Sequence, residues 1–122
     1  MTGTVQLDGK NLTTGEVVDI GLGRAAVAFA PGVEKKIARL RTGLERQLVE
    51  RPDIRMYGIN VGCGDLKDTD ISPAAFEEYQ ERYIKAHNCG TGRAIPVAIA
   101  RAMLAIRLNS FAKGHSLSLI HI

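Results

Sequence analysis

The segment from Pro96 to Lys113 limits what this chain can fold into more than any other part of the sequence. Proline at its start and Gly114 just beyond its end predict a helix. Apolar side chains cover most of the helix circumference, and two arginines interrupt them: Val97, Ile99, Met103, Leu104, Ile106 and Leu108, with Arg101 and Arg107. We therefore expect other helices to bury this one, because a helix that is apolar nearly all round is normally found in a core.

Two other substantial helices are predicted, which is too few to surround the apolar one. The first begins with Pro31 as its first helical residue, ends before Pro52 and carries an apolar stripe at spacings of three and four: Val33, Ile37, Leu40, Leu44 and Leu48. The second begins at Ser72 and Pro73 and ends before Gly90, and one of its faces holds Phe76, Tyr79, Tyr83 and His87. We expect the chain to be an incomplete part of a larger helical fold.

The first thirty residues predict two short strands with a short helix between them. Residues 5–9 end in an Asp-Gly turn, and residues 25–29 alternate weakly. Between them, Thr13 and Glu16 have the spacing of a capping box, and Gly21 and Gly23 end the helix. The fold class is mainly α, with short β-strands near the N-terminus, in a single domain of 122 residues.

Composition excludes several classes of function. The charges sum to +3 and include no block of five or more like charges, and 5% aromatic residues without tryptophan leave few platforms for stacking bases, so we expect no nucleic-acid partner. We also expect no membrane partner and a cytoplasmic protein, because no apolar run reaches membrane-spanning length and no signal peptide is visible. Cys63 and Cys89 are predicted to be free thiols. With His87 they are too few ligands for a zinc site, so no metal is expected.

A tyrosine at the start of a glycine-rich loop is the strongest sign of chemistry. Three glycines follow Tyr57 within seven residues, as expected where a backbone needs positive φ or close approach to a ligand. Gly62 is expected to help order this loop, and Asn60 to do so through side-chain to backbone hydrogen bonds. A strand that simply turns here is the alternative interpretation.

Several motifs, in order, resemble the aromatic amino acid ammonia-lyase family, and members that act on histidine look most similar. The motifs are Leu7-Asp8-Gly9, Tyr57-Gly58-Ile59-Asn60 with Gly62 and Gly64, His87 before Gly90-Thr91-Gly92, and Leu108-Asn109-Ser110 with Lys113-Gly114. The resemblance runs from about Val5 to Ser116, and it implies that residues 1–116 are the N-terminal segment of the ammonia-lyase (fumarase/aspartase-like) helical fold. Residues 117–122 match nothing in the family, and we expect them to be an assembly artefact.

The resemblance implies a catalytic site. Tyr57 would be the base that removes the β-proton, and Gly64 and His87 would bind the substrate. A phenol has a pKa of about 10, so a tyrosine base needs neighbouring positive charge or hydrogen bonds to act near neutral pH. The family's electrophile is a 4-methylidene-imidazol-5-one ring formed from Ala-Ser-Gly, a triplet that this sequence lacks. The chain alone is therefore expected to be inactive, and a completed copy to be a homotetramer.

The implied reaction is loss of ammonia from an aromatic amino acid, with L-histidine giving urocanate as the leading assignment. Cys63, Asn88 and Cys89 depart from the family pattern near the pocket, so tyrosine ammonia-lyase and tyrosine aminomutase stay open. Two alternatives lie outside the family. Residues 61–65 resemble the first motif of S-adenosylmethionine-dependent methyltransferases, which requires an immediately following helix. A small helical interaction module would instead use the apolar helix as its interface.

Overall fold

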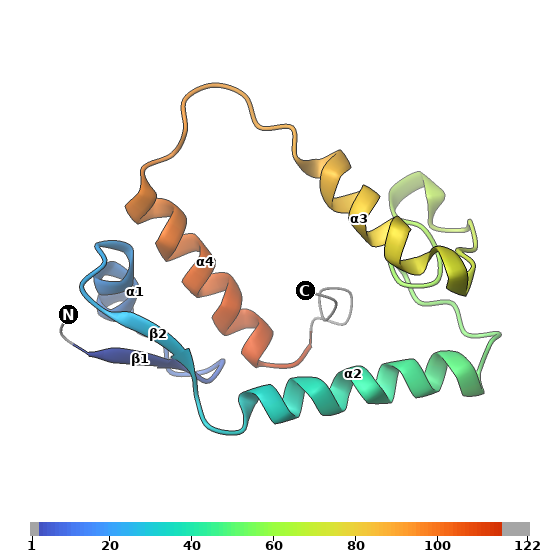
Figure 1. The fold of residues 1–122 in the computed structure, drawn as a ribbon, viewed down its shortest axis with the longest axis horizontal. Helices are drawn as coiled ribbons and strands as arrows, with labels where there is room; N and C mark the ends of the chain where they lie inside the picture. The colour runs from blue at the N-terminus through green and yellow to red at the C-terminus, as the bar shows by residue number, and fades with distance from the viewer. Residues whose placement is uncertain (1–2, 116–122) are drawn as a thin grey trace. The chain divides into compact units, whose positions relative to one another are not determined.

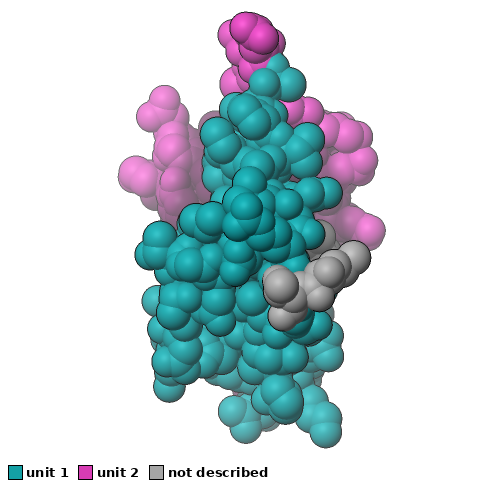
Figure 2. Space-filling view, turned by 90° about the vertical axis from the view of Figure 1, so that its left-hand side faces the viewer, with its two compact units in different colours: residues 1–47, 94–122 teal, residues 48–93 magenta. Residues whose placement is uncertain are grey.

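The computed structural model describes residues 3–115, which form two compact units. Of the described residues, unit 1 combines residues 3–47 with residues 94–115, and unit 2 is formed by residues 48–93 (Figure 2). The predicted tail at residues 117–122 lies outside the described residues. Helices dominate both units, as the sequence predicts (Figure 1).

Unit 1 begins with two short strands joined by a helix. Strand β1 (Thr4–Leu7) pairs in parallel with β2 (Ala26–Phe29), and α1 (Thr14–Gly21) connects them. The predicted capping box is confirmed, because the Thr13 hydroxyl accepts from the Glu16 backbone N–H while the Glu16 carboxylate accepts from the Thr13 N–H. Leu7 is the most deeply buried large side chain of the strands, at 1% exposure.

Helix α2 (Val33–Glu50) follows β2 and starts two residues later than predicted. Pro31 is not its first helical residue. Gly32 adopts φ of +87°, and its carbonyl accepts the Lys36 N–H, so the turn occupies Pro31 and Gly32 and the helix begins after them. The predicted apolar stripe is confirmed, because each of its residues is buried or half-buried in the helix: Val33, Ile37, Leu40, Leu44 and Leu48.

Helix α4 (Val97–Ala112) is the predicted apolar helix, and it packs on α1 and β1 (Figure 1). A Cβ on Gly21 would lie 2.8 Å from the Ala98 carbonyl oxygen, so only glycine permits this close approach of the two helices. The side-chain oxygen of Asn109 accepts a hydrogen bond of 2.8 Å from the Gly9 N–H. At the helix end, the Lys36 ammonium donates to the Lys113 carbonyl at 2.8 Å.

Within the described residues most of the apolar surface of α4 stays exposed, as expected of a chain whose other helices are too few to surround it. Ala105 and Ala112 are buried, whereas large apolar side chains on the rest of the helix stay between 38% and 65% exposed: Val97, Ile99, Met103, Leu104, Ile106 and Leu108. The physical reason is that, among residues 3–115, α1 and β1 pack on α4, while α2 reaches its C-terminal end, where the Lys36 ammonium lies 3.5 Å from the Ala112 carbonyl oxygen.

Unit 2 contains the glycine loop and helix α3 (Phe76–His87). The loop, residues 54–71, includes a short 3-10 helix (Gly64–Leu66), and a second 3-10 helix (Pro73–Ala75) leads into α3. Ser72 makes no side-chain capping bond, so the predicted start of the helix there is a 3-10 turn and the α-helix begins later. Helix α3 ends at His87, which precedes the glycines expected to close it.

Candidate functional site

The side chain of Asn60 spans the base of the glycine loop. Its carbonyl oxygen accepts from the Met56 N–H at 2.7 Å, and its amide nitrogen donates to the Ile54 carbonyl at 2.6 Å. The backbone carbonyl of Asn60 also accepts from the Ile71 N–H at 2.9 Å, where the chain leaves the loop. One partly buried residue thus holds three points of the loop backbone.

The glycines close the loop tightly. Gly58 adopts φ of +71° and donates its N–H to the Val61 carbonyl at 3.1 Å, which folds the chain back directly after Tyr57. A Cβ on Gly62 would lie 2.3 Å from the Leu66 carbonyl oxygen, closer than any side chain permits. Ile59 and Val61 are buried between these glycines at 5% and 4% exposure. The loop therefore has a small apolar core of its own.

Tyr57 presents its phenol at the surface of this loop. Its side chain is 64% exposed, and its oxygen accepts a hydrogen bond of 2.9 Å from the Gly64 N–H. Gly64 has φ of +59°, and a Cβ added to it would meet no other atom within 4 Å. The structure therefore brings two of the predicted site residues, Tyr57 and Gly64, into direct contact. Once the phenol has lost its own proton, the phenolate oxygen has lone pairs beyond the one that accepts the Gly64 N–H, and it can take a proton from a ligand.

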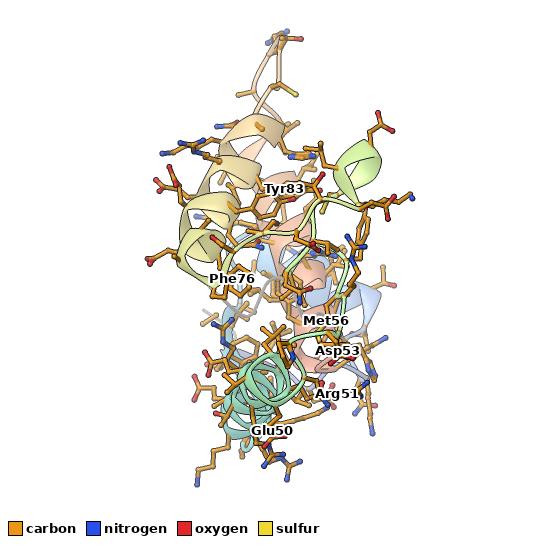
Figure 3. All side chains as sticks on the ribbon, turned by 90° about the vertical axis from the view of Figure 1, so that its right-hand side faces the viewer. Glu50, Arg51, Asp53, Met56, Phe76 and Tyr83 are labelled. Atoms are coloured by element: carbon orange, nitrogen blue, oxygen red, sulfur yellow. The ribbon has the colours of Figure 1, made fainter. Side chains whose placement is uncertain are left out.

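The aromatic face of α3 lies against the loop through Cys63. Figure 3 shows Tyr83 extending from α3 toward the loop. Burial raises the pKa of Tyr79 to about 12, and a hydrogen bond with the Cys63 thiol adds to this shift. The same thiol raises the pKa of Tyr83, and the neighbouring Tyr57 adds a smaller contribution. These interactions place three phenols and one thiol in a single cluster.

His87 ends the aromatic face, and the backbone fixes its tautomer. Its ring centroid lies 4.2 Å from that of Tyr83, and its Nδ1 lies 2.8 Å from the Tyr83 carbonyl oxygen. A carbonyl oxygen accepts hydrogen bonds and cannot donate them, so Nδ1 carries a proton. In the neutral ring, Nε2 is then a hydrogen-bond acceptor on an exposed side chain. Tyr83 contacts this imidazole and is also close enough to Tyr57 for the two phenols to interact.

Sequence reasoning missed Gln80, which connects α3 to the loop. The Gln80 side-chain amide donates to the Gly58 carbonyl at 2.9 Å. A signal was present, since Gln80 lies between Phe76 and Tyr83 at spacings of four and three and therefore shares their face of the helix. Cys63 was noted as a departure from the family pattern, but its contact with the α3 phenols was not predicted.

Within residues 3–115, no group of three or more His, Cys, Asp and Glu side chains could hold a metal ion. In the same residues, no helix is both long and apolar enough to cross a membrane. The residues present do not provide the family's prosthetic ring, because no Ala-Ser-Gly occurs in the sequence. Residues 61–65 lead into a three-residue 3-10 helix, whereas a methyltransferase cofactor loop requires a longer helix there.

Two solved enzyme structures share the fold of this chain over part of their own length. Tyrosine aminomutase from Streptomyces globisporus superposes with a TM-score of 0.78 at 30% identity, covering 93% of this chain and 21% of that one. Ergothionase, an ergothioneine-degrading enzyme from Treponema denticola, superposes with a TM-score of 0.85 at 27% identity, covering 97% of this chain and 24% of that one. The fold is therefore that of the aromatic amino acid lyases and aminomutases.

The family profile of aromatic amino acid lyases matches residues 12–117. Histidine ammonia-lyase from Bos taurus is 33% identical over 112 residues, which is 92% of this chain and 17% of that protein. The chain belongs to the aromatic amino acid lyase family, as the motifs of the sequence predict. It spans about a fifth of the length of the relatives it matches.

Proposed function

We propose that the protein containing this chain removes ammonia from L-histidine without oxidation and gives urocanate. The observation that carries the proposal is the exposed Tyr57 hydroxyl, which accepts a hydrogen bond from the Gly64 N–H at the surface of the glycine loop. The curated relatives named histidine ammonia-lyase support the choice of substrate. The substrate and the activity are proposed for the whole protein that contains this chain, and not for these 122 residues alone.

Tyr57 is proposed as the base of the reaction. After the phenol has given its own proton to solvent, the phenolate oxygen takes the β-proton of the substrate, the electrons of that C–H bond form the new C=C bond, and the C–N bond breaks to release the amine as ammonia. The family's methylidene-imidazolone group, formed outside these 122 residues, would supply the electrophile that makes the amine a leaving group. Gly64 holds the phenolic oxygen through its N–H, so the base keeps one orientation while a second lone pair receives the proton.

His87 is proposed to recognise the substrate ring. Because its Nδ1–H is engaged by the Tyr83 carbonyl, its Nε2 would accept a hydrogen bond from the ring of the substrate. The imidazole N–H of histidine is such a donor, whereas the phenyl ring of phenylalanine has none. A polar partner of this kind favours a substrate with a ring donor over one without it.

The phenol of tyrosine is also a ring donor, so a tyrosine ammonia-lyase or aminomutase is the second candidate. The structural similarity to tyrosine aminomutase at 30% identity favours it specifically. A lyase would release a free unsaturated acid from tyrosine, and an aminomutase would return the amine to the β-carbon. The two candidates therefore differ in products as well as in substrate.

We further propose a homotetramer in the cytoplasm for the whole protein. The exposed apolar side chains of α4 support this proposal, since further helices of the same protein or of other subunits would remove them from water. Size-exclusion chromatography with light scattering on the full-length protein tests the assembly, and a monomer would contradict it.

Substrate specificity is tested by incubating the full-length protein with L-histidine, L-tyrosine and L-phenylalanine separately and measuring ammonia and the organic product. We expect the highest kcat/KM for L-histidine, with urocanate as product, and no turnover by residues 1–122 alone. Tyr57→Phe should lower kcat by a factor of at least about 100, because the proposed base is lost. Near-parental turnover by this variant, or no turnover of any of the three amino acids by the parent, would contradict the proposal.

A further inference from the structure

We propose that Gln80 is a positioning residue that holds the loop backbone beside Tyr57, an inference that rests on the proposed role of Tyr57 as the base. The Gln80 side-chain amide donates a hydrogen bond of 2.9 Å to the carbonyl of Gly58, the residue directly after Tyr57. Gln80 is half-buried, and Gly58 is buried, so water competes poorly for this bond. The bond links α3 to the loop across 22 positions of sequence.

Several hydrogen bonds hold the backbone after Tyr57, and the one from Gln80 comes from α3. The Gly58 N–H donates to Val61, and the N–H of Ile59, in the same peptide group as the Gly58 carbonyl, donates to Met56 at 3.0 Å. These two bonds lie inside the loop and would move with it as a body. The bond from Gln80 instead fixes that peptide group to a helix.

The position of Gln80 on α3 connects the two halves of the proposed site. Phe76, Gln80, Tyr83 and His87 are spaced by four, three and four residues, so they lie along one face of the helix. The same face therefore holds the loop at Gly58 and presents the His87 ring. A rigid helix between the two contacts sets the distance from the base to the ring that recognises the substrate.

The chemistry of this position requires a hydrogen-bond donor of glutamine length. A methionine side chain has similar length and volume and no donor, so Gln80→Met would leave the Gly58 carbonyl without its partner while α3 keeps its packing. The loop would then shift relative to α3. A displacement of about 1 Å of a catalytic group can lower the rate by about 100-fold.

The experiment uses the full-length enzyme with L-histidine and with the same substrate deuterated at the β-carbon. For Gln80→Met, we expect kcat to fall by about 10- to 100-fold and KM to change by less than about threefold. The isotope effect on kcat should be at least as large as in the parent, because proton removal is the step that is slowed. Gln47→Met is the matched control, since Gln47 is exposed on α2, and it should leave these quantities unchanged.

Gln80→Lys provides the complementary test because it restores a donor of comparable reach. We expect it to recover most of the kcat lost in Gln80→Met. A parental kcat in Gln80→Met, or a lower kcat with a smaller isotope effect than the parent shows, would overturn the proposal. An equal loss of kcat in Gln80→Met and Gln80→Lys would also overturn the proposal.

Hydrogen exchange separates this proposal from that of the base. The Ile59 amide should exchange faster in Gln80→Met than in the parent and the Gln47→Met control, whether or not the enzyme is active. Unchanged exchange would overturn the role of Gln80 alone. Parental turnover in Tyr57→Phe would overturn the role of Tyr57 as the base, while exchange would still decide whether Gln80 holds the loop.

Discussion

Gly62→Ala is the substitution whose effect follows most directly from the geometry of the loop. A Cβ at this position would lie 2.3 Å from the Leu66 carbonyl oxygen and 2.7 Å from the Leu66 Cβ. Ordinary van der Waals contact begins at 3.4 Å, so the chain must open by about 1 Å. The atoms that must yield include backbone, which cannot rotate away as the end of a long side chain can.

This opening would reach Tyr57 through Gly64. The Gly62 N–H donates to the Thr69 carbonyl at 3.0 Å, and Gly64, two residues later, donates to the Tyr57 oxygen. Moving Gly62 therefore displaces the donor that orients the phenol. From the dependence of catalysis on the placement of reacting groups, a shift of about 1 Å predicts a fall in kcat of about 100-fold.

The assay is steady-state turnover of the full-length enzyme, with circular dichroism to compare helix content. Two other glycines of unit 2 provide the comparison. Gly64→Ala meets open space and pays only the strain of positive φ, about 1 kcal/mol, so its loss should be smaller. Gly90→Ala meets neither obstacle and should match the parent. The reasoning is refuted if Gly62→Ala keeps kcat within about threefold of the parent.

Three further predictions concern other parts of the chain. His87→Phe should raise the ratio of kcat/KM for L-phenylalanine to that for L-histidine by about tenfold or more, and an unchanged ratio would make His87 structural. Tyr79 should titrate near pH 12. The stability that comes from keeping this phenol neutral in the folded protein is therefore present below about pH 10 and lost as the pH rises toward 12. Alkaline absorbance titration, compared with Tyr79→Phe, checks this, and titration at the ordinary phenol pKa would contradict it. Thr13→Ala should destabilise α1 by about 1 kcal/mol, which would appear as about fivefold faster hydrogen exchange of the α1 amides. Exchange at the parental rate would show that the capping box does not stabilise the helix.

Features set by near neighbours in the sequence could be predicted, whereas those set by distant backbone could not. The capping box of Thr13 and Glu16 joins residues three apart, and both hydrogen bonds form as predicted. The start of α2 was misplaced because Pro31 suits a first helical turn locally, but Gly32 turns with positive φ and delays the helix. The aromatic face of α3 was predicted correctly from its spacing and is formed by Tyr79, Tyr83 and His87.

The same distinction holds in the candidate site. Tyr57 was found because glycines cluster after it, and the family resemblance supplied its proposed role. Gln80 was missed because a glutamine on a helix is usually solvated, and its partner is a backbone carbonyl that no sequence pattern identifies. The fixed tautomer of His87 likewise depends on the Tyr83 carbonyl, whose position becomes known when the end of α3 is seen.

The apolar side chains of α4 do not by themselves determine how the helix is rotated about its axis. Nearly every side of the helix is apolar, so a rotation would replace one apolar side chain with another. One close backbone contact and one hydrogen bond, near the two ends of α4, determine its rotation instead. Near the first turn, Gly21 admits the backbone at Ala98, and near the last, the Asn109 side chain meets the Gly9 N–H. Two contacts about three helical turns apart thus fix both the rotation and the axial position of α4. A substitution at Gly21 would therefore change which apolar side chains α4 offers to its neighbours, without changing the sequence of α4 itself.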